Sequence, residues 1–129
     1  MVRFFALLTL MLLPLGAAFA QSVERDQIRD AFRNGNARGL SAHFTTNIDL
    51  TVEQVGEVYS KEQAEMVLSR FFSDHSPQGF EIRHEGKSKG DDHYCIGNLT
   101  TSKTPYRVTF FLKKEGEVYK MRQLRIEPD

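Results

Sequence analysis

Two patterns of apolar residues divide the chain into a mainly helical part followed by a part made of strands. Apolar residues recur every three or four positions through residues 60–75, the spacing of one face of an α-helix. They alternate with polar residues at 44–52 and through much of residues 80–127, which indicates strands with one buried face. The order therefore predicts helices first and then a sheet.

The clearest predicted helix runs from Ser60 to His75. Ser60 and Gln63 have the spacing of a capping box, in which each side chain accepts a hydrogen bond from the other's backbone N–H. The apolar stripe of this helix consists of Ala64, Val67, Leu68, Phe71 and Phe72. Such a stripe predicts that the helix packs against the sheet along its whole length.

The segment before this helix predicts two further helices and a strand. Ser22 is expected to cap a first helix that Gly35 ends, and Asn36 to cap a short second helix. Residues 44–52 alternate between apolar and polar positions, as in a half-buried strand. Gly56 is expected to mark the turn into a short second strand.

The remainder of the chain predicts four strands joined by short polar turns. The four runs are Phe80–Gly86, His93–Thr101, Pro105–Lys114 and Glu117–Glu127. Such short connections favour an antiparallel meander. In the last run, Val118, Leu124 and Ile126 are assigned to one face and Tyr119 and Met121 to the other. Both faces of the sheet are thus expected to be partly covered, one of them by helices.

Together these elements predict an α+β fold. We expect a curved antiparallel sheet of about four long strands plus one or two N-terminal strands, wrapped on a long helix and an N-terminal helical pair. The long helix at residues 60–75 is expected to lie in the hollow of the sheet formed by the last strands.

The N-terminus has the three parts of a secretory signal peptide. Arg3 supplies the positive charge, Phe4–Leu13 the apolar run, and Ala18–Ala20 the small-residue cleavage site. The run is shorter than the roughly 18 residues that a membrane crossing requires. The pattern predicts a signal peptide at residues 1–20, which is cleaved, and a single exported domain at 21–129 without a transmembrane anchor, located in the periplasm or outside the cell.

Composition narrows the class of protein further. The chain has 17 lysine and arginine residues and 17 aspartate and glutamate residues, so it lacks the basic excess typical of nucleic-acid binding. The single cysteine, Cys95, excludes an internal disulfide, and its distance from the cleavage site excludes a lipoprotein. The fold must therefore be stabilised by its core, to which the 7 phenylalanines that follow residue 20 (10 − 3) and the 4 tyrosines are available.

Several short segments resemble a known family. They are Asn47–Thr51, Tyr59–Lys61, Gln63–Glu65, Phe71–Phe72, Ile96–Gly97 and Gln123–Glu127. With the element order, they resemble the cystatin-like cone fold of the nuclear transport factor, ketosteroid isomerase and scytalone dehydratase superfamily, and more closely a family of short exported bacterial proteins of unassigned function. The resemblance implies a pocket between sheet and helices but brings no catalytic residues, and Phe32 stands where the isomerase pattern has a tyrosine.

Asp49, His84 and His93 are the candidates for acid–base catalysis. Alternation places Asp49 on the polar face of its strand, so a solvent-facing position is the simpler interpretation. His93 and Cys95 share a strand face, and a hairpin would bring His84 opposite His93 or Tyr94, close enough for an activated thiolate or a metal site. A buried structural cysteine is the commoner arrangement, so we expect neither a metal nor a cofactor.

Two further groups of residues are candidates for binding. The expected pocket-wall residues are Phe71, Phe72, Tyr94, Tyr106 and Tyr119. Basic residues gather on the last two strands at Lys113, Lys114, Lys120, Arg122 and Arg125. The basic group suits an acidic partner or membrane surface, although lysines on strands also serve to prevent aggregation.

Three functions remain open at this point. The first is a non-catalytic exported domain that binds a small apolar ligand or a protein partner, with a homodimer through the sheet as one form. The second is an isomerase-like or dehydratase-like enzyme, which requires an ionisable group facing the cavity. The third is a structural or assembly role for the exposed face of the sheet.

Overall fold

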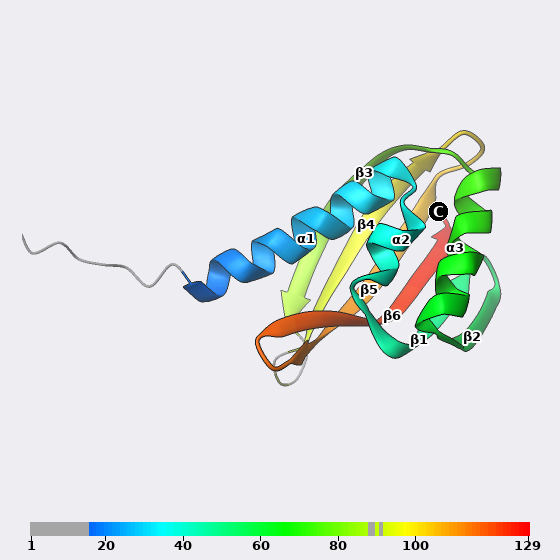
Figure 1. Cartoon of the computed structure of the whole chain (residues 1–129). Helices are drawn as coiled ribbons and strands as arrows, with labels where there is room; N and C mark the ends of the chain where they lie inside the picture. The colour runs from blue at the N-terminus through cyan, green and yellow to red at the C-terminus, as the bar shows by residue number, and fades with distance from the viewer. Residues whose placement is uncertain (1–15, 88–89, 91) are drawn as a thin grey trace, which may run out of the picture.

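The computed structural model describes residues 16–87, 90 and 92–129, and within them it shows three helices packed on one face of a six-stranded sheet (Figure 1). The elements are α1 (Gly16–Asn34), α2 (Ala37–Ser41), β1 (Phe44–Val52), β2 (Val55–Ser60), α3 (Lys61–Asp74), β3 (Pro77–Lys87), β4 (His93–Thr101), β5 (Tyr106–Glu115) and β6 (Val118–Pro128). The predicted α+β class is confirmed. The positive and apolar parts of the predicted signal peptide, and part of the turn between β3 and β4, lie outside the described residues.

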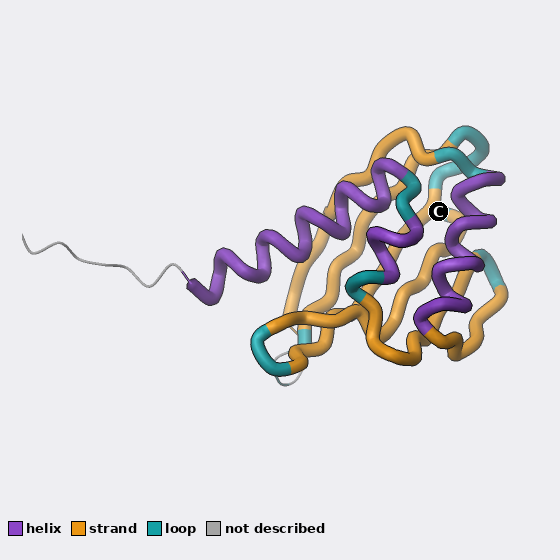
Figure 2. The backbone as a smooth tube through the Cα atoms, viewed as in Figure 1, coloured by secondary structure: helices purple, strands orange, loops and turns teal. Residues whose placement is uncertain are grey.

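The sheet has the strand order β2-β1-β6-β5-β4-β3. Strands β3 to β6 form the predicted antiparallel meander. Strand β1 pairs antiparallel with β2 but parallel with β6, so the sheet is mixed and the last strand of the chain lies in its interior. Figure 2 shows the helices as one layer against this sheet.

The predicted caps are confirmed at two helices. The Ser60 hydroxyl accepts a hydrogen bond from the Gln63 backbone N–H at 3.2 Å, and the Gln63 side chain accepts one from the Ser60 N–H, which completes the capping box of α3. The Asn36 side chain accepts a hydrogen bond from the Gly39 N–H at 2.9 Å at the start of α2. Gly35, just after α1, has φ +62°, a left-handed conformation that favours glycine.

Two predicted boundaries are wrong. Helix α1 begins at Gly16 and not after Ser22, because the alanine-rich segment at residues 16–20 also favours a helix. The turn between β1 and β2 lies at Glu53, whose φ is +60°, and not at Gly56. The Glu53 N–H donates to the Ile126 carbonyl at 2.7 Å, so β6 fixes the position of this turn.

The helices divide the inner face of the sheet among themselves. Helix α1 packs along β3, α3 packs on β1 and β2, and α2 lies between the two other helices (Figure 1). The expectation that α3 lies in the hollow of the last four strands is correct only in part: Phe71 of α3 contacts Tyr106 of β5, but α3 packs mainly on β1 and β2, and α1 packs on β3. The predicted core face of α3 is nevertheless correct, because Leu68, Phe71 and Phe72 are buried.

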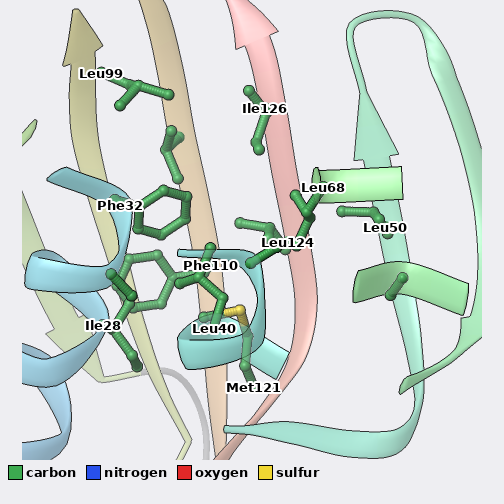
Figure 3. Close-up of a cluster of buried hydrophobic side chains, with 14 of the residues drawn as sticks. Ile28, Phe32, Leu40, Leu50, Leu68, Leu99, Phe110, Met121, Leu124 and Ile126 are labelled. Atoms are coloured by element: carbon green, nitrogen blue, oxygen red, sulfur yellow. The ribbon is translucent and has the colours of Figure 1, made fainter. Parts of the chain in front are cut away.

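The space between the helices and the sheet is filled by large apolar side chains. Phe32 of α1 is fully buried, and its ring centroid lies 4.6 Å from that of Phe80 and 6.3 Å from that of Phe110. Leu40 of α2 and Met121 of β6 lie beside Phe110 in the same cluster (Figure 3). The core thus occupies the region where the family resemblance predicted a pocket.

Two register shifts change which side chains face the helices. Gln123 pairs with Phe111 and Met121 with Leu112, which leaves Arg122 as an extra residue in β6. Met121 is consequently buried on the same face as Leu124 and Ile126, contrary to the strict alternation predicted for this strand. In β3, Ile82 pairs with Gly97 and His84 with Ile96. Arg83 is therefore the extra residue of this strand.

Candidate functional site

The face of the sheet opposite the helices, called the uncovered face below, contains a hollow of about 580 Å³. Its rim consists of Arg83, His84, Arg107, Arg125 and Glu127. Its floor consists of Ile96, Asn98, Thr109 and Phe111. The floor residues are half-buried, whereas the arginines and the histidine of the rim are exposed, so the hollow is open to solvent.

The register of β4, β5 and β6 explains the shape of this hollow. Thr109 of β5 lies between Ile96 of β4 and Arg125 of β6. Arg107 lies between Asn98 and Glu127 in the neighbouring row. Because the short side chains stand at the centre and longer ones surround them, the sheet surface is depressed around Thr109.

The register shifts add arginines to the uncovered face. On a regular strand consecutive side chains point to opposite faces, yet Arg83 and His84 both line the hollow because β3 is bulged there. The extra residue of β6, Arg122, places its guanidinium 5.5 Å from the centroid of the Phe111 ring, a cation–π contact at the edge of the hollow. Sequence reasoning missed Arg83, although the polar run at residues 83–85 does break the alternation. It included Arg122 in the basic group of the last two strands but not its place beside Phe111.

The charges of the rim are unevenly paired. Three arginines stand against one glutamate, a net formal charge of +2 with the histidine neutral. Arg125 Nε lies 2.9 Å from Glu127 Oε1, and Arg83 Nη2 lies 3.0 Å from Glu81 Oε2. Within the described part of the chain, Arg107 forms no ion pair.

The three catalytic candidates lie far apart. Asp49 on β1 and His84 on β3 are separated on the uncovered face by β6, β5 and β4, roughly 19 Å at the usual strand spacing. His93 is half-buried at the end of β4, where its Nε2 lies 3.2 Å from the Tyr119 hydroxyl. The expected alignment of His84 with His93 or Tyr94 is wrong, since His84 pairs with Ile96.

Cys95 is a buried thiol on the helix-covered face, with 4% of its surface exposed. Burial raises the pKa of Cys95 to about 12, and the negative charge of Glu85 adds to the rise while Arg25 opposes it. The side chain is therefore protonated at neutral pH. Among the residues that the structure describes, no group of three or more histidine, cysteine or acidic side chains is placed to hold a metal ion.

Three of the five pocket-wall candidates belong to the core. Phe71, Phe72 and Tyr106 are buried, and the rings of Phe71 and Tyr106 meet edge to face at 5.1 Å. The Tyr106 hydroxyl donates a hydrogen bond of 3.0 Å to Glu53 in the β1–β2 turn. Burial and this carboxylate raise the pKa of Tyr106. His75, which stacks on Phe71, lies 3.6 Å from the same carboxylate, so the cluster joins this turn to the end of α3.

The other two pocket-wall candidates lie outside this cluster. Tyr94 is on the uncovered face, where its ring covers Gly86 and lies 6.3 Å from Phe111. Tyr119 is half-buried beside His93, and its backbone N–H donates to the Glu24 carboxylate of α1 at 3.0 Å. The five candidates thus contribute to different parts of the molecule, and Tyr94 alone among them lies near the hollow.

Within residues 16–87, 90 and 92–129, no helix combines the length and the hydrophobicity that a membrane crossing requires.

The fold is the cystatin-like, nuclear-transport-factor-like cone fold. The chain is similar to a cystatin-like protein of Nostoc punctiforme PCC 73102, with 12% identity, a TM-score of 0.68 and coverage of 88% of this chain and 77% of that one. It is also similar to a protein named "Rd1NTF2_04 with long sheet", with 17% identity, a TM-score of 0.66 and coverage of 83% and 98%.

The family is shown by a match over most of the chain. The model for the domain of unknown function DUF4783 matches residues 25–127, and the protein belongs to the DUF4783 family. A family member from Bacteroides uniformis ATCC 8492 is 29% identical, with a TM-score of 0.75 and coverage of 81% of this chain and 95% of that one. A search of curated proteins found no match.

Proposed function

We propose that this protein is an exported, non-catalytic binding domain whose ligand is a protein partner and whose binding surface is the uncovered face. The observation that carries the proposal is the open hollow on this face, with arginines around a floor of Ile96, Thr109 and Phe111. Arginine and aromatic side chains supply much of the binding energy at protein interfaces.

The filled core argues against a small apolar ligand between the helices and the sheet. Phe32, Leu40 and Phe110 occupy that region and are fully buried. Sites for small molecules enclose most of the ligand surface. The hollow on the uncovered face has an exposed rim and suits a side chain presented by a larger partner.

The enzyme alternative has less support from the same geometry. Asp49 and His84 are exposed and lie on strands separated by three others. His93 lies beside Tyr119 on the other side of the sheet, away from the hollow. General acid–base chemistry needs its groups within hydrogen-bond reach of one substrate, and this arrangement does not bring the candidates together.

Export is the second part of the proposal. The family match begins at residue 25, five residues after the predicted cleavage at Ala20 (25 − 20). Expression of the full coding sequence in a Gram-negative host, followed by intact mass measurement of the periplasmic fraction, tests it. The expected product begins at Gln21. Uncleaved protein retained in the cytoplasm would contradict this part of the proposal.

Site-specific photo-cross-linking tests the binding surface. A benzoylphenylalanine replaces His84 at the rim of the hollow or, as the matched control, the exposed Arg70 of α3. After irradiation of intact cells of the native organism, we expect a discrete adduct of higher mass from position 84 and none from position 70. Adducts from both positions alike, or from neither, would argue against a protein partner at the uncovered face.

A further inference from the structure

Arg107 is the cation of the hollow that is left for a ligand. Glu127 is its neighbour across the strand pair, but the Glu127 carboxylate pairs with Arg125 at 2.9 Å instead. Arg83 is likewise paired with Glu81. Arg107 is exposed, and in the described residues its guanidinium has no acidic partner.

The surroundings of Arg107 combine hydrogen-bonding groups with an apolar surface. The amide of Asn98 lies across the strand pair from Arg107, and the hydroxyl of Thr109 lies two residues along β5 on the same face. Beyond Thr109, Ile96 and the Phe111 ring form an apolar part of the floor. A ligand with an anionic group next to an apolar group fits this arrangement, in which the polar groups around Arg107 are followed by an apolar surface.

We infer that the hollow binds an acidic segment of a protein partner, with one carboxylate on Arg107 and an adjacent aromatic or aliphatic side chain against Ile96 and Phe111. A guanidinium matches a carboxylate through two parallel N–H···O bonds. The inference rests on the proposed function and adds the chemistry of the partner to it.

The charge of the hollow argues against a second copy of this chain as the occupant. In a two-fold symmetric dimer centred on the hollow, the same patch would face itself. Each copy would then bring the unpaired Arg107 to the interface, a net formal charge of +1 when Glu81, the partner of Arg83, is counted with Glu127 against the three arginines (3 − 2). Like charges brought together in this way oppose association, whereas an acidic segment neutralises them.

A peptide titration tests the inference directly. The probe is the blocked peptide acetyl-Glu-Phe-Asp-amide, and its uncharged counterpart acetyl-Gln-Phe-Asn-amide is the control. Each is titrated into the isotope-labelled domain that remains after signal cleavage, and amide chemical shifts are recorded. We expect saturable shifts at Asn98, Thr109 and Phe111 with the acidic peptide, and at least about tenfold weaker binding of the amide peptide.

Variants distinguish a specific contact with Arg107 from attraction by the overall positive charge of the domain. R107Q is expected to lower the affinity for the acidic peptide by about tenfold or more. R107K is expected to lose less affinity than R107Q, because lysine keeps the charge but not the paired N–H geometry. R70Q removes an exposed arginine from α3 and is expected to bind as the parent does. Unchanged spectra away from the hollow establish that each variant is folded.

Several outcomes would overturn the inference. Equal binding by R107Q and R70Q, equal binding of the two peptides, or shifts confined to the helices would each do so. A dimer by light scattering that F111D disrupts would assign the hollow to a second copy. If cross-linking from position 84 captures a partner while the acidic peptide does not bind, the carboxylate inference fails and the proposed function stands. If cross-linking also fails, the proposed function fails as well.

Discussion

Gly97 allows β3, β4 and the side chain of Phe80 to approach one another closely, and its replacement by alanine is the most informative test of the fold. A Cβ atom at Gly97 would lie 2.6 Å from the backbone carbonyl oxygen of Glu81 and 2.8 Å from the Phe80 ring. Both distances are shorter than carbon contacts in proteins. The nearest atom belongs to the backbone of β3, beside the bulge at Arg83, so it cannot move as a flexible side chain would.

The expected cost of G97A is that of overpacking a filled core, about 1–3 kcal/mol of unfolding free energy. Gly79 offers a matched control in the adjacent strand, because a Cβ added there meets nothing within 4 Å and its φ is not positive. Alanine at Gly79 reduces the freedom of the unfolded chain, so G79A is expected to be neutral or to stabilise by up to about 1 kcal/mol.

Urea unfolding followed by circular dichroism measures both variants. With a slope of about 2 kcal/mol per molar urea, a loss of about 2 kcal/mol lowers the midpoint by about 1 M. The G79A midpoint should remain at or above that of the parent. If G97A and G79A unfold at the same urea concentration, the close approach of β3 and Phe80 to β4 is refuted.

Three further predictions address caps, burial and ionisation. S60A should lower the unfolding free energy by about 1 kcal/mol through loss of the α3 cap, whereas S69A on the exposed side of that helix should not, as urea unfolding will show. F110A should lower the unfolding free energy by about 3–5 kcal/mol, and F111A should lower it by less, because Phe110 is fully buried and Phe111 only half-buried. Equal losses in the two variants would contradict the assignment of these residues to opposite faces of the sheet. Because burial raises the pKa of Cys95 from 9.0 to about 12, the folded state holds this proton more tightly than the unfolded state. Stability should therefore decline as the pH rises from 9 towards 12, and the decline should be shallower in C95A; parallel curves would show that the thiol plays no part.

Most of the fold could be predicted because its signals are local. Ser60 and Gln63 form the predicted cap, and the Asn36 cap and Gly35 ending follow from residues adjacent in sequence. In β5 the alternating residues Tyr106, Val108, Phe110 and Leu112 are all buried, as the alternation through residues 80–127 indicates. In each case the residues that determine the structure lie within one turn or one strand.

The uncovered-face site could not be predicted, because it depends on pairing between strands. Nothing in the segment around Arg83 shows that Ile82 and His84 will pair with consecutive residues of β4. The same holds for Arg122, whose place in β6 depends on the partners available in β5. The basic cluster on the last two strands was noted, but its arrangement around Thr109 requires the register of three strands.

The interior position of β6 has a consequence for how the chain reaches its native state. In the part of the chain that the structure describes, β1 and β2 are paired to the meander through β6 alone, which pairs with β1 on one side and β5 on the other. Until residues 118–128 are present, these two portions of the sheet have no strand pairing with each other, and the contacts that join them are distant in sequence. A polypeptide with this connectivity completes its sheet only after residues 118–128 have been synthesised, however early the other strands form.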